Sequence, residues 1–402
     1  MNEPLPFAGL VVLDISTYIA GPLAATLLAD FGADVVKVED PQGGDPNRVA
    51  GGFSSYPQSP VNYPWQMDAR NKRSLALDLK HPQAHDVLAR LVARADVLIT
   101  NFPMPVRARL RLRHEDLQPL NERLVYASLT GYGESGPDRD QPGFDTAAYF
   151  ARAGWFDAQR HEGQPPHFAL PSSGDRATAT ALFAAILMAL YRRERSGRGG
   201  MVGASLVAAG LWSNAITAQG ALLGAFLPPR PPRERPRSAL VNIYRTADDR
   251  WFQLVLAVED PAWPGLCRAI GQPALATDPR FATTPERRRH AADLTAILDA
   301  AFGARDWTYW QAQFKTHQII HGAIARMQDI PHDPQLRAAG AVVATDNPDL
   351  PLSIGPPLTA DFAQPVRARP APALGEHTDA VLAESGYTAA DIAALRAAGV
   401  VA

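Results

Sequence analysis

The stretch that decides the fold is residues 10–45, which read LVVLDISTYIAGPLAATLLADFGADVVKVEDPQGGD. Residues 10–15 form a short apolar run of strand length. Pro22 stands in the first turn of the helical pattern that follows, where a proline fits well. Residues 34–39 form a second strand-like run and end at a Pro-Gln-Gly-Gly turn. A strand, a helix and a second strand in this order predict a βαβ unit with parallel strands.

The same alternation continues beyond this unit. Further strand-like runs lie at residues 74–79, 97–99 and 124–129, and a helical pattern lies at about 82–94. We therefore expect a mostly parallel sheet with helices on both faces. No GxGxxG motif follows the first strand, which argues against a dinucleotide-binding site.

The bulk composition narrows the class of protein. A chain of 402 residues with 46% hydrophobic content predicts a globular protein of two domains. The formal net charge of −2 indicates no nucleic-acid or membrane-surface partner. Cys267 is the only cysteine, which excludes an intrachain disulfide and a cysteine-based zinc site, and we predict no metal. The N-terminus lacks a signal-peptide pattern and residues 181–191 are too short to span a membrane, so we expect a cytoplasmic protein.

A composition break divides the chain. Residues 227–237 are rich in proline and arginine, which predicts a linker or an exposed loop. Beyond it, residues 241–246 and 251–256 read as two strands joined by a turn, and helical patterns follow to about residue 330. A final amphipathic helix is expected at about 389–398.

Asp175 is the main candidate for chemistry. It follows the polar turn Pro-Ser-Ser-Gly and precedes a run of helix formers that starts at about Ala177. An aspartate at a helix start can accept N–H groups of the first turn, and we expect its carboxylate to stay ionised at neutral pH, as a nucleophile must. The alternative from this position alone is a plain helix cap.

Four blocks in order along the chain resemble the class III CoA-transferase family, which includes formyl-CoA transferase and the alpha-methylacyl-CoA racemases. They are residues 11–45; residues 71–84 with 95–102; residues 173–175 with the helix and the SGRGGMVGASL that closes it; and residues 332–340 with 375–401. The resemblance implies that Asp175 attacks an acyl-CoA and forms an aspartyl anhydride and then an aspartyl-CoA thioester. Coenzyme A would enter as a substrate, with no permanently bound cofactor.

The resemblance also implies the binding residues. Those expected to contact CoA or the acyl substrate are Ile19, Ala20, Leu77, Asp78, Leu79, Lys80, Asn101, Phe102, Arg109, Phe144 and Asp145. The implied partners are an acyl-CoA, a carboxylic acid and a second copy of the chain in an interlocked homodimer.

The implied fold is α/β, with a Rossmann-like large domain formed from both chain ends and a smaller α+β domain. Residues 1–205 and 326–402 would contribute to the large domain, the latter including a return linker. Residues 206–237 would form a linker and residues 238–325 the small domain.

Two departures from the family pattern bear on function. Racemases of the family carry a histidine where this chain has Phe144, which cannot move a proton. The glycine-rich lid of formyl-CoA transferase has no counterpart in residues 236–246, and residues 142–155 look more like members that act on larger or aromatic acids. A racemase or isomerase, including intramolecular CoA transfer, and an inactive acyl-CoA-binding homologue remain the alternatives. Roles for His161 and His167 also stay open.

Overall fold

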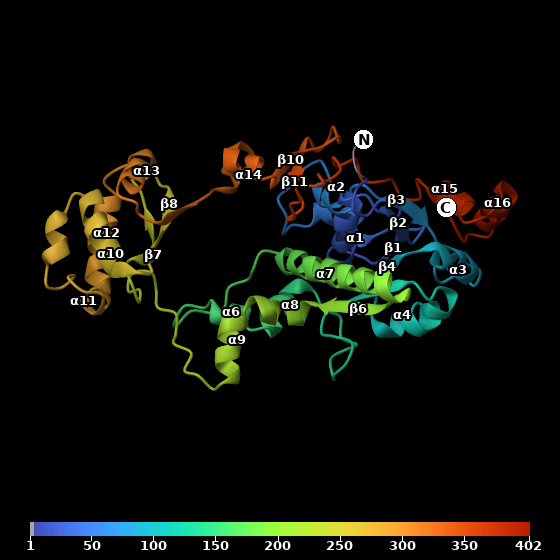
Figure 1. Cartoon of the computed structure of the whole chain (residues 1–402), viewed down its shortest axis with the longest axis horizontal. Helices are drawn as coiled ribbons and strands as arrows, with labels where there is room; N and C mark the ends of the chain where they lie inside the picture. The colour runs from blue at the N-terminus through green and yellow to red at the C-terminus, as the bar shows by residue number, and fades with distance from the viewer. Residues whose placement is uncertain (1–3) are drawn as a thin grey trace. The chain divides into compact units, whose positions relative to one another are not determined.

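The computed structural model describes residues 4–402, which form two compact units (Figure 1). The larger unit takes residues up to 158 together with 167–226 and 334–402, so both ends of the chain lie in it. The smaller unit takes residues 159–166 and 227–333.

A six-stranded parallel sheet forms the centre of the larger unit, as the alternating pattern predicts. Its strand order is β3-β2-β1-β4-β5-β6. The strands are β1 (Val11–Ile15), β2 (Asp34–Glu39), β3 (Arg73–Ala76), β4 (Val97–Thr100), β5 (Val125–Thr130) and β6 (Gly200–Ser205).

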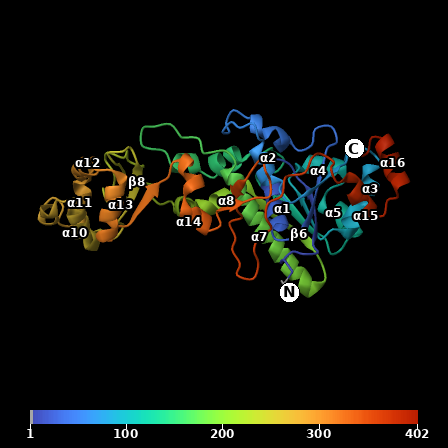
Figure 2. The same ribbon diagram turned by 90° about the horizontal axis from the view of Figure 1, so that it is seen from above.

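Helices cover both faces of this sheet because its strands are apolar on both sides. One face packs on α1 (Ala20–Asp30) and α7 (Ser173–Ser196), which also contact each other. The other face packs on α3 (Ala84–Arg94), α15 (Thr378–Glu384) and α16 (Ala389–Ala397). Figure 2 shows these two C-terminal helices beside α3.

The rest of the larger unit consists of shorter elements. They are α2 (Tyr63–Asp68), α4 (Met104–Leu110), α5 (His114–Leu117), the π-helix η3 (Thr146–Arg152), α6 (Trp155–Ala158), α8 (Leu206–Ser213), α9 (Ala215–Leu222), α14 (Pro334–Ala338) and the antiparallel pair β10 (Val342–Ala344) and β11 (Leu352–Ile354), with 3-10 turns at 46–52 and 118–120. Residues 206–222, which we expected in a linker, thus form two helices of this unit.

The smaller unit is an antiparallel sheet with helices. Its strands are β7 (Val241–Arg245), β8 (Trp251–Val255) and β9 (His321–Ile324), and its helices are α10 (Glu259–Ala269), α11 (Thr284–Arg289), α12 (Ala291–Phe302) and α13 (Trp307–Thr316), with 3-10 turns at 273–277 and 327–332. An aromatic core that includes Tyr244, Phe252 and Phe302 holds them together. In the part of the chain from residue 4 onward, no helix is long and apolar enough to cross a membrane.

Candidate active site

The strand order places a binding crevice at the carboxyl ends of β1 and β4. The chain leaves β1 toward β2 and β3 on one side, whereas β4, β5 and β6 lie on the other. In open parallel sheets, ligands bind where the strand order reverses in this way. Ser16 and Thr17 follow β1, and Asn101 and Phe102 follow β4, so these residues meet at that point.

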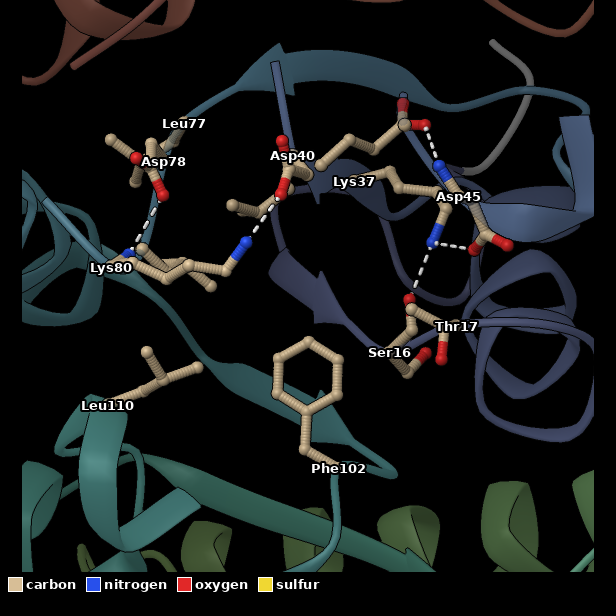
Figure 3. Close-up of a pocket in the computed structure, with 14 residues that line it drawn as sticks. Ser16, Thr17, Lys37, Asp40, Asp45, Leu77, Asp78, Lys80, Phe102 and Leu110 are labelled. Atoms are coloured by element: carbon tan, nitrogen blue, oxygen red, sulfur yellow. Dashed lines mark hydrogen bonds and ion pairs between the residues drawn. The ribbon is translucent and has the colours of Figure 1, made fainter. Parts of the chain in front are cut away.

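A cavity of about 210 Å³ opens along this edge of the sheet (Figure 3). Its walls are partly apolar, with Leu79, Phe102 and Leu110 facing a more polar side. The full lining is Ser16, Thr17, Lys37, Val38, Glu39, Asp40, Gly44, Asp45, Leu77, Asp78, Leu79, Lys80, Phe102 and Leu110. Five of the predicted contact residues therefore share one cavity: Leu77, Asp78, Leu79, Lys80 and Phe102.

A buried charge cluster supports the polar side of the cavity. The Lys37 ammonium lies 2.8 Å from Asp45 and 3.6 Å from Asp14, and it donates to the Ser16 carbonyl at 2.7 Å (Figure 3). Lys72 donates to Asp14 at 2.9 Å and to the Pro22 carbonyl at 2.7 Å. Burial alone would lower the pKa of Lys37, but the charges of Asp14 and Asp45 outweigh it and raise the pKa. Both lysines therefore stabilise the β1–α1 turn through hydrogen bonds to its backbone carbonyls.

Asn101 fixes the same turn from the side of β4. Its Oδ1 accepts the Thr17 N–H at 2.9 Å, and its Nδ2 donates to the Thr17 carbonyl at 2.7 Å. Both ends of the side-chain amide are thus engaged with one residue of the turn. The contact between Asn101 and a ligand stays a prediction, as do those of Ile19 and Ala20, whose side chains are buried.

Cationic side chains lie at the open rim. Lys80 is exposed and forms an ion pair with Asp40 at 3.0 Å, as drawn in Figure 3. Arg109 is exposed as well and near enough for its charge to oppose protonation of Lys80. Hydrogen bonding to Asp40 nevertheless raises the pKa of Lys80, so its ammonium stays protonated beside the cavity.

The C-terminal segment of the chain supports one wall of the cavity from behind the lining residues Leu77 and Asp78. The Asp78 N–H donates to the Val400 carbonyl at 2.9 Å, and Leu77 and Val401 form an antiparallel bridge. Val400 and Val401 are buried. The last residues of the chain therefore set the position of the segment from Leu77 to Lys80.

Asp175 lies inside the first turn of α7, so the alternative that it is a plain helix cap does not hold. The helix begins at Ser173, and the residue before it, Ser172, has φ 70° and makes no capping hydrogen bond with its side chain. Asp145 supplies the cap instead, because its buried carboxylate accepts the Gly174 N–H at 3.1 Å. An acidic residue from a separate segment thus occupies the N–H groups at this helix start.

The expectation that the Asp175 carboxylate stays ionised at neutral pH holds only in part. Burial, followed by the nearby charge of Asp145, raises the pKa of Asp175 from 3.8 to about 7. Arg176 opposes this rise only in part, since it pairs with Asp68 at 3.1 Å. The Asp175 carboxyl therefore holds its proton to a higher pH than an ordinary aspartate.

Two aromatic rings lie near this helix start. Tyr18, in the β1–α1 turn, contacts Phe144 edge to face with ring centroids 5.4 Å apart. Phe144 directly precedes Asp145. Of the two histidines left open, His161 belongs to the smaller unit, where its ring bonds the Pro231 carbonyl, and His167 belongs to the larger unit and is exposed.

The strand ends of β1 and β2 supply cavity residues that sequence reasoning missed, among them Ser16, Thr17, Lys37, Asp40 and Asp45. Ser16, Thr17 and Asp40 directly follow a predicted strand, so the switch-point rule applied to the predicted sheet would have pointed to that edge. Lys37, in contrast, lies within the second strand and Asp45 in the loop after it. The charge cluster has no comparable signal, because pairing of Lys37 with Asp45 depends on the path of the loop between them.

The model of a protein family described as CoA-transferase family III matches residues 7–378. Succinyl-CoA–D-citramalate CoA-transferase of Chloroflexus aurantiacus is 32% identical, and the alignment covers 100% of this chain and 99% of that protein. (R)-2-hydroxy-4-methylpentanoate CoA-transferase of Clostridioides difficile is 29% identical over 94% of this chain and 95% of that protein. The crystal structure of a CAIB/BAIF family protein from Brucella suis superposes with a TM-score of 0.85 at 27% identity, covering 95% of this chain and 100% of that one.

Proposed function

Because the chain belongs to CoA-transferase family III, we propose that it moves CoA from an acyl-CoA to a carboxylic acid with Asp175 as the nucleophile. The observation that carries the proposal is the half-buried Asp175 carboxyl in the first turn of α7, with its pKa raised to about 7. A more basic carboxylate is a better nucleophile, and a pKa near 7 keeps much of it ionised at neutral pH.

The proposed reaction has four exchanges. The Asp175 carboxylate attacks the thioester carbonyl, which releases CoA thiolate and leaves an acyl-aspartyl anhydride. The thiolate attacks the aspartyl carbonyl, which releases the donor carboxylate and leaves an aspartyl-CoA thioester. The acceptor carboxylate attacks this thioester and frees the thiolate again. The thiolate then takes the acyl group from the new anhydride and restores the Asp175 carboxylate.

The cavity at the ends of β1 to β4 suits CoA. Its apolar side, with Leu79, Phe102 and Leu110, fits the less polar parts of CoA. Lys80 and Arg109 at the rim can bind the phosphates of CoA. A panel of acyl-CoAs with carboxylate acceptors, followed by mass spectrometry of the product thioesters, tests the activity directly. Formation of a new acyl-CoA without net hydrolysis supports transfer, whereas hydrolysis alone contradicts it.

The racemase alternative needs a second proton-transfer group in place of Phe144. Incubation with a 2-methylacyl-CoA in deuterium oxide separates the two activities. A transferase leaves the alpha hydrogen in place, and a racemase exchanges it for deuterium. Labelled free acid added to the transfer assay also distinguishes intermolecular from intramolecular CoA transfer, and the absence of any product would favour an inactive binding homologue.

The pKa of Asp175 predicts how activity and stability change with pH. Only the carboxylate attacks, so kcat/KM should rise with pH through about 7. Asp145→Asn removes the neighbouring charge, lowers the pKa of Asp175 and should move this midpoint to lower pH.

The same raised pKa predicts how stability changes with pH. Between about pH 4 and 7 the folded state binds more protons than the unfolded state, so the Asp175 contribution to stability falls as pH rises. Asp175→Asn should therefore raise Tm relative to wild type more at pH 8 than at pH 5, as calorimetry can measure.

Removal of the C-terminal residues should weaken CoA binding. Deletion of residues 399–402 removes the Val400 carbonyl and the Val401 bridge that position Leu77 and Asp78. We expect KM for an acyl-CoA to rise roughly tenfold, equivalent to about 1.4 kcal/mol, with a smaller change in kcat. Deletion of the exposed Ala402 alone is the matched control. Unchanged KM in the longer deletion would exclude this role for the C-terminus.

We also propose that the large domain assembled from both chain ends pairs with a second copy, in the interlocked arrangement that the family resemblance implies. Helices α8 and α9 support this, because Trp212 is 84% exposed, Ile216 93% and Leu222 81%. Monomers rarely expose apolar surface of this kind. Light scattering should give twice the chain mass of 43.3 kDa, and Ile216→Asp should weaken the dimer. A monomer at micromolar concentration would contradict the proposal.

A further inference from the structure

The ring pair of Tyr18 and Phe144 leaves apolar surface open. Tyr18 is 39% exposed and Phe144 is 59% exposed, although their rings meet at 87° with centroids 5.4 Å apart. The edge-to-face contact orders the two rings without burying them. Such a preformed aromatic surface suits an apolar ligand group.

Hydrogen bonds fix the backbone that carries both rings. Tyr18 has φ 63°, a strained conformation for a residue with a side chain, and its N–H donates to Asp45 at 3.0 Å. The Phe144 carbonyl accepts the N–H groups of Ala147 and Ala148 at 3.0 and 2.9 Å, which anchors it to the start of η3. These contacts fix the backbone position from which each ring projects, and the edge-to-face contact orders the rings themselves.

The pair also joins the two parts of the proposed site. Tyr18 belongs to the β1–α1 turn at the cavity end of the sheet, next to Ile19. Phe144 precedes Asp145, whose carboxylate binds the Gly174 N–H beside Asp175. The two rings thus connect the turn beside the cavity with the segment that caps the helix of the proposed nucleophile.

We propose, on the basis of the transferase function above, that the Tyr18–Phe144 pair forms a wall of the acyl site and selects acyl groups with an aromatic or branched apolar end. The charged groups bonded next to these two residues are the carboxylates of Asp45 and Asp145. The ion pair of Asp45 with Lys37 at 2.8 Å leaves Asp145 as the carboxylate that would repel the second carboxylate of a small dicarboxylic acid. The wall thus favours apolar acyl chains over succinyl-like ones.

Binding measurements in the Asp175→Asn background test this selectivity without chemistry. By calorimetry, 3-phenylpropanoyl-CoA should bind roughly tenfold more tightly than propanoyl-CoA or succinyl-CoA. Phe144→Ala should reduce this preference to about twofold or less, and Phe144→Leu should keep part of it. Phe362→Ala, which removes a 70% exposed phenylalanine of the C-terminal segment, is the matched control and should keep the full preference.

Equal or tighter binding of succinyl-CoA, or a preference that survives Phe144→Ala, would overturn the inference. The same acyl-CoAs given to the Asp175 enzyme separate this result from the proposed function. A phenylpropanoyl preference in binding with no transfer from any donor would uphold the aromatic wall and refute the transferase. Transfer from succinyl-CoA without a phenylpropanoyl preference in binding would uphold the transferase and refute the aromatic wall.

Discussion

Asp175→Asn should abolish CoA transfer, with a fall in kcat of about 10³-fold or more. The amide has nearly the same size as the carboxyl, so the first turn of α7 and the Asp145 cap should persist. What is lost is the nucleophilic oxygen, without which neither the anhydride nor the aspartyl-CoA thioester can form. Steady-state assays with mass-spectrometric detection of product measure the loss.

The control for this variant is Asp361→Asn, which changes an exposed aspartate of the C-terminal segment. Its kcat should stay within about twofold of wild type, because substitution of an exposed residue away from the site has little effect on the stability of the fold. Retention of CoA binding by Asp175→Asn shows that the site is intact. Substantial transfer by a correctly folded Asp175→Asn would exclude the carboxylate as nucleophile.

Lys37→Met should destabilise the larger unit by about 3–5 kcal/mol. The variant removes the cation between two buried carboxylates and leaves Asp45 without its ion-pair partner at 2.8 Å. Asp14 keeps Lys72 but loses the second positive charge that lowers its pKa. Urea unfolding should report the loss as a lower midpoint.

Lys80→Met is the matched control, since it makes the same substitution at an exposed ion pair with Asp40. Its effect on the free energy of unfolding should be about 1 kcal/mol or less. Equal effects of the two variants would show that the buried cluster contributes little to stability. A large effect of Lys37→Met alone supports its role beneath the β1–α1 turn.

The parallel sheet was predictable because its strands are apolar and regularly spaced. The runs at 10–15, 34–39 and 124–129 match β1, β2 and β5 closely. β6 was not anticipated, because a strand that opens on glycine carries little apolar signal. The structure explains that composition: a Cβ at Gly199 would lie 2.0 Å from the Leu124 carbonyl oxygen, so only glycine allows the chain to approach β5.

Local sequence predicted the start of α7 less well than the sheet. The polar residues 171–174 suggest a turn, but Ser173 and Gly174 are already helical because Asp145 caps them from another segment. The pKa of Asp175 has the same origin, since it depends on burial and on Asp145, which lies 30 residues earlier in the chain. A contact between distant segments leaves no local pattern, so neither property could be read from residues 171–176.

The most direct test of the account traps the intermediate on Asp175. The enzyme is incubated with succinyl-CoA, 3-phenylpropanoyl-CoA and acetyl-CoA in turn, hydroxylamine is added, and the peptide that contains Asp175 is analysed by mass spectrometry. We predict a hydroxamate on Asp175 that requires an acyl-CoA and that is absent in Asp175→Asn. Turnover that leaves Asp175 unmodified with every productive donor, or a hydroxamate on a different carboxylate, would contradict the central claim.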